Sequence, residues 1–160
     1  MSDAPIPPLA RALGRIPSGL FVATTRTPAG PLGFVASFVQ QAGFDPPTVS
    51  VAIAKGREHL TAIRESGCFG VSILDKSSSG LMGPFFKQHP EGASPFDGLE
   101  HVSAPSGSPV LSDALAWLDC RVTGEFATGD HVVVYGVVEA GDQTREGEPS
   151  FHSRKDGRSY

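Results

Sequence analysis

The segment AKGREH, residues 54 to 59, carries the side chains best suited to binding an anion. Lys55, Gly56 and Arg57 lie where an apolar run ends and an amphipathic segment begins, and His59 follows them. A helix starting there would add unpaired backbone N–H groups and partial positive charge to the two cations. The segment predicts a phosphate or carboxylate site. The alternative is a charged turn in solvent.

A second candidate is the triplet Gly129, Asp130 and His131, which opens a strongly hydrophobic run. Four valines and a tyrosine lie between residues 132 and 137, a composition typical of a strand. His131 would then stand at the rim of whatever the strand encloses. An imidazole in that place donates to a ligand or titrates near neutral pH. The alternative is a histidine that only caps the strand.

The C-terminal stretch FHSRKDGRSY mixes aromatic and basic residues, among them His152, Arg154 and Tyr160. Such a mixture is suited to a strand that closes a pocket or reaches a partner subunit. The alternative is a frayed basic tail.

Two adjacent amides, Gln40 and Gln41, stand in the stretch ASFVQQAGFDPP at residues 36 to 47. Neighbouring side chains on a pleated strand point to opposite faces, so at least one amide should face a core, a cleft or a partner.

The elements that must position these residues are mostly strands. Strands follow one another directly more often than through helices, which favours a mainly β fold (β-rich α+β), an antiparallel barrel with short peripheral helices. The 14 prolines and 19 glycines indicate tight turns between them. A broken helix and an ordered loop are expected over 77–98. We expect helices over 8–16 and 57–66, and strands over 20–26, 32–44, 48–54, 68–74, 114–130 and 131–140.

Bulk properties narrow the class of protein. With 160 residues we expect one domain over 9–160 after a flexible tail over 1–8. The net charge of −4 argues against a nucleic-acid partner, and no stretch approaches the roughly 18 apolar residues of a membrane span. Cys68 and Cys120 stand in apolar runs, so we expect buried free thiols and a cytoplasmic protein.

Several common catalytic signatures are absent from the sequence: GxGxxG, GxxxxGK[ST], HExxH and GxSxG. The histidines show no metal-ligand spacing, so no metal site is expected. P-loop enzymes, zinc enzymes and the usual serine hydrolases are therefore poorly supported.

Five segments, taken together and in order, resemble the flavin reductase-like, FMN-binding split-barrel family. The similarity runs from about residue 10 to residue 160 and is greatest to the flavin reductase module of diflavin flavoproteins. The irregular stretch LMGPFFKQHPEGASPFDG is similar to the linker loop of that sub-group. The five segments are ALGRIPSGLFVATTR, GFVASFVQQAGFDPPTVSVAIAK, GSPVLSDALAWLDCRV, GDHVVVYGVVEA and HSRKDGRSY.

This resemblance implies a split antiparallel barrel, usually a homodimer, that binds FMN or sometimes FAD near the subunit interface. It also implies reduction of the flavin by NADH or NADPH. The family's flavin strand matches Ala36, Ser37, Phe38, Val39, Gln40 and Gln41. Its phosphate-holding turn matches Lys55, Gly56, Arg57 and His59, its Gly-Asp-His motif matches Gly129, Asp130 and His131, and its C-terminal stretch matches His152, Arg154 and Tyr160.

Under this resemblance His131 is the catalytic candidate, because it would lie within reach of the nicotinamide or the flavin edge. One departure concerns the flavin strand, where many members carry hydroxyl side chains. Phe38 and Gln40 stand at two of those positions here. We expect Gln40 on the cofactor side and Gln41 buried against the barrel or a dimer partner.

The leading hypothesis is an NAD(P)H-dependent flavin reductase that passes reduced flavin or electrons to a monooxygenase or another acceptor. The alternative is a non-catalytic split barrel that holds flavin, heme or another planar ligand as a carrier or sensor. No residue is an obligatory acid or base, so the sequence leaves the alternative open.

Overall fold

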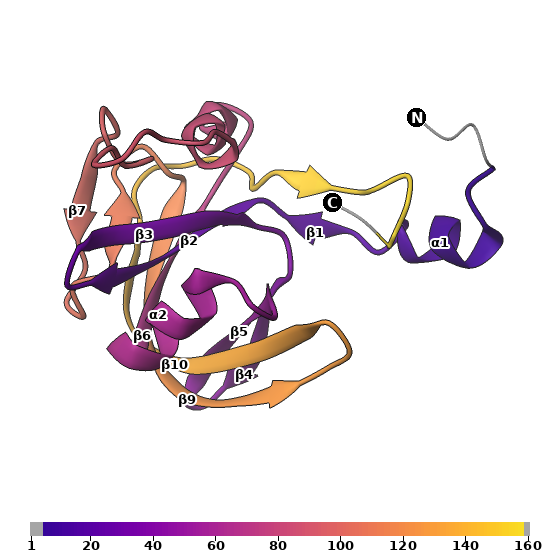
Figure 1. Ribbon diagram of the computed structural model, residues 1–160, viewed down its shortest axis with the longest axis horizontal. Helices are drawn as coiled ribbons and strands as arrows, with labels where there is room; N and C mark the ends of the chain where they lie inside the picture. Colours follow the sequence, from indigo (N-terminus) through magenta and orange to yellow (C-terminus); the bar gives the residue numbers. More distant parts are fainter. Residues whose placement is uncertain (1–4, 159–160) are drawn as a thin grey trace.

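Seven antiparallel strands form the main sheet of the protein, which a computed structural model describes over residues 5–158. Their order across the sheet is β3-β2-β6-β9-β10-β5-β4, which confirms the mainly β antiparallel fold (Figure 1). The strands are β2 (Phe21–Thr27), β3 (Gly30–Ala36), β4 (Val39–Phe44), β5 (Pro47–Ala54), β6 (Cys68–Ile73), β9 (Ala116–Ala127) and β10 (His131–Gln143).

The two edge strands, β3 and β4, are consecutive in the chain, and only Ser37 and Phe38 join them. Three residue steps span at most about 11 Å, so the sheet must curl until its edges approach each other. The prediction of one strand over 32–44 is therefore wrong. The chain leaves its pairing with β2 at Ala36 and joins β5, where the Phe38 carbonyl accepts a hydrogen bond from the Ala52 N–H at 2.9 Å.

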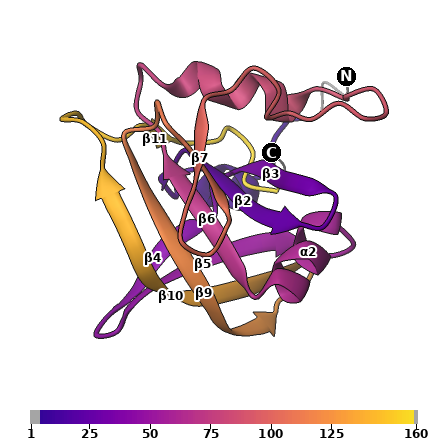
Figure 2. The same ribbon diagram turned by 90° about the vertical axis from the view of Figure 1, so that its left-hand side faces the viewer.

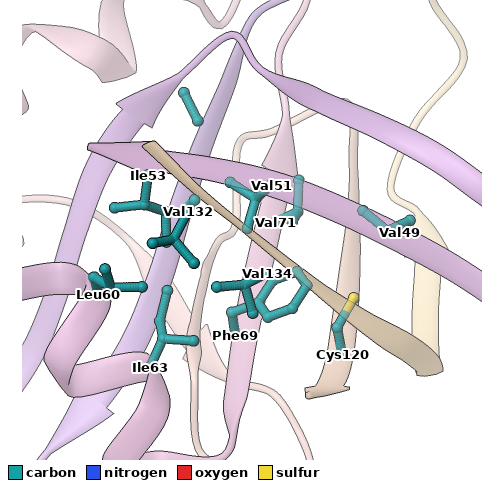
Figure 3. Packing of buried hydrophobic residues seen from close by; sticks show 12 residues of the cluster. Val49, Val51, Ile53, Leu60, Ile63, Phe69, Val71, Cys120, Val132 and Val134 are labelled. Carbon is teal, nitrogen blue, oxygen red and sulfur yellow. The ribbon is translucent and has the colours of Figure 1, made fainter. Parts of the chain in front are cut away.

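The core lies inside the curled sheet and is closed at one side by α2 (Glu58–Ser66). Val49, Val51 and Ile53 of β5 are buried while their sequence neighbours are more exposed, the alternation expected of a strand that is covered on one face. Leu60 and Ile63 of α2 pack against this apolar face (Figure 3). The start of α2 is thereby fixed beside the end of β5.

A 3₁₀ helix, η1 (Ser79–Phe86), crosses one end of the barrel, and Pro84 lies within it. Figure 2 shows it at the top of the molecule, above the strands. It confirms the predicted broken helix. Gly33 permits its close approach, because a Cβ there would lie 2.9 Å from the Phe96 ring and 3.0 Å from the Phe85 ring.

An arm projects from the barrel and contains both ends of the described chain (Figure 1). We define it as residues 8–19, with α1 (Pro8–Leu13) and β1 (Ser18–Gly19), together with residues 151–158, which begin with β11 (Phe151–His152). β11 pairs with β1, and the Gly157 N–H donates to the Ala10 carbonyl at 2.8 Å. The expected tail over 1–8 falls partly on residues 1–4, which are outside the described residues, and Pro8 already belongs to α1.

Two further features complete the fold. A small hairpin is formed by β7 (His101–Ser103) and β8 (Pro109–Leu111). Cys68 and Cys120 are buried free thiols, as predicted. Over residues 5–158, no helix has the length and apolar character needed to span a membrane.

Candidate functional site

A cavity of about 480 Å³ lies at the corner where the edge strands meet. The end of β3, the Ser37–Phe38 link and the end of β5 form its floor, and η1 covers one side. Its apolar lining includes Phe34, Ala36, Ile53, Met82 and Phe85. Apolar and aromatic walls of this kind suit a planar organic ligand.

The rim of this cavity is cationic. Arg57 lines it from the start of α2, and His152 and Arg154 line it from the C-terminal part of the arm. The guanidinium carbon of Arg154 lies 4.7 Å from the centroid of the Phe38 ring, a cation–π contact. The backbone N–H of Arg154 also donates to the carbonyl of Gly14 at 3.0 Å. Gly14 directly follows α1, so this end of the helix holds the Arg154 backbone in place. The structure thus brings Arg57 of the predicted anion-binding turn and His152 and Arg154 of the C-terminal stretch to one opening.

A larger cavity of about 980 Å³ lies between the arm and the strands β4 and β5. The two cavities share Ser37, Phe38, Ala52 and Arg154 as lining residues. Gln40 and Gln41 line only the larger one, and both are exposed. The predicted burial of Gln41 against the barrel is therefore wrong, because β4 is an edge strand with no neighbour on its outer side within the described chain.

The side chain of Lys55 does not face the smaller cavity, although the sequence predicted that it binds an anion together with Gly56 and Arg57. Its ammonium donates to the carbonyls of Thr128 and Gly129 at 3.0 and 2.8 Å, and it lines neither cavity. Gly56 follows with a φ of 80°, the left-handed conformation that favours glycine. Arg57 is therefore the cation of this turn that faces the smaller cavity.

His131 stands beside the cavity wall. Its ring centroid lies 5.8 Å from that of Phe38, in an edge-on arrangement. Its Nδ1 lies 2.9 Å from a carboxylate oxygen of Asp130, and this hydrogen bond lowers the pKa of the Asp130 carboxyl. A carboxylate accepts, so Nδ1 carries the proton and the ring orientation is fixed.

His59 lines the cavity from the first turn of α2 and packs against Phe34, with ring centroids 4.8 Å apart. Its Nε2 lies 3.1 Å from the Gly33 carbonyl, which only accepts, so Nε2 carries the proton. Burial lowers the pKa of His59, so the ring is neutral at neutral pH. A neutral ring whose N–H is already used does not fit the predicted place in a phosphate-holding turn.

Sequence reasoning missed the wall formed by Met82, Phe85 and Phe86 of η1. The one available signal was a cluster of large apolar residues in an otherwise irregular, glycine-rich stretch. Tyr160, a predicted cofactor ligand, lies outside the described residues. Over 5–158, no cluster of His, Cys, Asp and Glu side chains is arranged to hold a metal ion.

Comparison with known proteins identifies the family. The family described as "Flavin reductase like domain" matches residues 13–159, nearly the whole chain. The chain belongs to this flavin reductase family. It is 38% identical over 154 residues to Diflavin flavoprotein A 1 of Synechocystis sp., covering 95% of this chain but 27% of that protein. The chain thus spans about a quarter of the length of such curated relatives.

Solved structures of flavin reductase relatives match over most of their own length. The NADH:FAD oxidoreductase SgcE6 of Streptomyces globisporus C-1027 superposes with a TM-score of 0.83 at 25% identity, over 96% of this chain and 95% of that one. Nitrilotriacetate monooxygenase component B of Mycobacterium thermoresistibile gives 0.83 at 29% identity, over 92% and 82%.

The neutral state of His59 predicts a pH dependence of stability. A lowered folded-state pKa means that the unfolded chain binds more protons as pH falls through 6.5, so the free energy of unfolding decreases on acidification. The His59→Gln variant should show a smaller decrease between pH 7.5 and 5.5 in urea denaturation. The variant His89→Gln, at an exposed position, is the control. An unchanged slope in His59→Gln would contradict a buried neutral His59.

Proposed function

We propose that this protein is a flavin reductase that binds FMN and transfers hydride to it from NADH or NADPH. The observation that carries the proposal is the cavity of about 480 Å³, which combines aromatic and aliphatic walls with a cationic rim at one opening. A flavin mononucleotide has the same two parts, an apolar ring system and a phosphate. A planar ligand without an anionic group would not account for the cationic rim formed by Arg57 and Arg154.

The residues present fit such a ligand. Phe34, Ala36 and Phe85 would pack on the ring system, and the polar backbone of Ser37 and Phe38 would face its heteroatom edge. Arg57 would hold the phosphate, since a guanidinium presents a fork of donors to phosphate oxygens. FMN is our proposal for the flavin. FAD is the alternative, supported by the name of the relative SgcE6.

When bound, the flavin supplies the hydride-accepting chemistry, and the protein contributes orientation and exclusion of water. η1 covers the cavity with Met82 and Phe85, which keeps water from that side. Asp130 holds His131 with Nδ1 protonated, and the His131 ring lies edge-on to Phe38, which lines the cavity. We propose that His131 acts from there by positioning the nicotinamide.

The acceptor of the reduced flavin is proposed from the same comparisons. One matched structure is named as a monooxygenase component, so a monooxygenase is a suitable recipient of reduced flavin. We propose that the protein passes reduced flavin or electrons to such an acceptor.

The first test is spectroscopic. The protein mixed with FMN under anaerobic conditions should lose the flavin absorbance when NADH or NADPH is added, faster than FMN alone. The reduction should be catalytic in protein. Bound FMN that neither nicotinamide reduces would favour the carrier or sensor instead, and a protein that neither binds FMN nor oxidises a nicotinamide would contradict the flavin reductase.

The second test concerns the phosphate. Arg57→Ala should weaken FMN binding by about 1.5 kcal/mol, the lower end for a hydrogen bond to a charged group, because Arg57 is exposed. Riboflavin, which lacks the phosphate, should bind equally well to both proteins in a fluorescence titration. Lys55→Ala is the matched control and should lose less, since its ammonium is bonded to backbone carbonyls. Equal losses for FMN and riboflavin would remove Arg57 from the phosphate role.

We also propose a homodimer whose contact covers the larger cavity. Two strongly exposed apolar side chains of the arm, Ile16 and Phe151, line this cavity, and two more are exposed at Leu9 in α1 and at Phe44 at the end of β4. Apolar surface of this extent marks interaction sites. Sedimentation equilibrium should give a dimer that Ile16→Ser and Phe44→Ser weaken, while the exposed control Val102→Ser does not. A wild-type protein that stays monomeric at high concentration would contradict the dimer.

A further inference from the structure

Asp75 follows β6 and is buried, with 6% of its surface exposed. It lines neither cavity, yet its carboxylate receives hydrogen bonds from two segments that do. A buried carboxylate is retained only where donors compensate the loss of hydration. The donors to Asp75 therefore tie two separate segments of the chain to one point.

The first segment is the start of η1. The Ser78 N–H and hydroxyl each donate to Asp75 Oδ1 at 2.8 Å, and the Ser77 hydroxyl donates at 2.9 Å. In return the Asp75 N–H donates to the Ser78 hydroxyl at 2.9 Å. Asp75 thus fixes the residue that precedes η1, and η1 carries Met82, Phe85 and Phe86 to the cavity.

The second segment is the stretch 144–154, which returns across the end of the barrel to the arm. Arg145 contacts both carboxylate oxygens of Asp75: Nη1 donates to Oδ2, and Nη2 donates to Oδ1 at 2.9 Å. Asp75 also forms a β-bridge with Pro149, and the Ser150 N–H donates to the Leu74 carbonyl at 2.9 Å. His152 and Arg154, which line the cavity, follow directly.

We propose that Asp75 and Arg145 are a positioning pair that sets the distance between the two covering walls of the site. One carboxylate anchors the apolar wall of η1 and the cationic wall of the C-terminal stretch. The fork of Arg145 makes the junction directional, since two parallel bonds define an orientation as well as a contact. That the ligand of this site is a flavin rests on the proposed function, whereas the anchoring of the two walls by Asp75 and Arg145 does not.

The electrostatics support the same geometry. The Arg145 guanidinium holds the pKa of the Asp75 carboxyl well below its usual range, which favours the charged pair. Removing Arg145 leaves a buried carboxylate with neutral donors only, which is costly in a low-dielectric site. Both walls should then loosen together.

The test combines hydrogen exchange with flavin binding in four variants: Arg145→Gln, Arg145→Lys, Asp75→Asn and the double variant Asp75→Asn/Arg145→Gln. Exchange needs no cofactor and reports the two walls directly. In Arg145→Gln, amides of 79–86 and of 150–154 should exchange faster, and those of β5 should not. Arg64→Gln is the matched control, because Arg64 makes a comparable two-bond pair with Glu125 at the other end of α2.

The FMN dissociation constant should rise about tenfold in Arg145→Gln and in Asp75→Asn and no further in the double variant, as expected when two residues act through one network. Arg145→Lys, which keeps one charged bond, should lie between wild type and Arg145→Gln. Faster exchange in only one wall, or an Arg145→Gln affinity equal to that of Arg64→Gln, would overturn the proposal. If wild type binds no FMN, the proposed function fails, while the exchange data still decide whether the pair anchors both walls.

Discussion

The two-residue link between β3 and β4 is the constraint on which the rest of the structure depends. It joins the opposite edges of a seven-stranded sheet, so the sheet has to curl and its edges have to meet at Ser37 and Phe38. The corner so formed lies beside the end of β5 and the start of α2. The cavity is therefore a consequence of chain connectivity, and its floor is made of backbone that pairing with neighbouring strands has already fixed.

Charge is distributed unevenly around this corner. Elsewhere several charged side chains pair with one another, as Arg64 does with Glu125 and Arg121 with Glu139. At the corner, Arg57 and Arg154 face the cavity, and Arg154 rests on the Phe38 ring. The arm makes this possible. Its β1–β11 pairing brings the C-terminal stretch back to the corner, where Arg154 contacts Phe38.

Local pattern was enough to predict most of the elements, including β5 and the two long strands β9 and β10, because burial on one face of a strand imposes a period of two. It was not enough for the break at Ser37, since β-forming residues continue through it and only the pairing partners change. The side chain of Lys55 shows the same limit. Its type and place in the turn suggested an anion ligand, and the nearby 128–129 carbonyls, distant in sequence, take its ammonium instead.

The central claim is that flavin binds in the cavity at the Ser37–Phe38 corner. A crystal structure of the protein with FMN tests it most directly. We predict density for the ring system between Phe34, Phe85 and the Ser37–Phe38 backbone, with the phosphate at Arg57. Flavin bound elsewhere on the protein, with this cavity holding only solvent, would contradict the account.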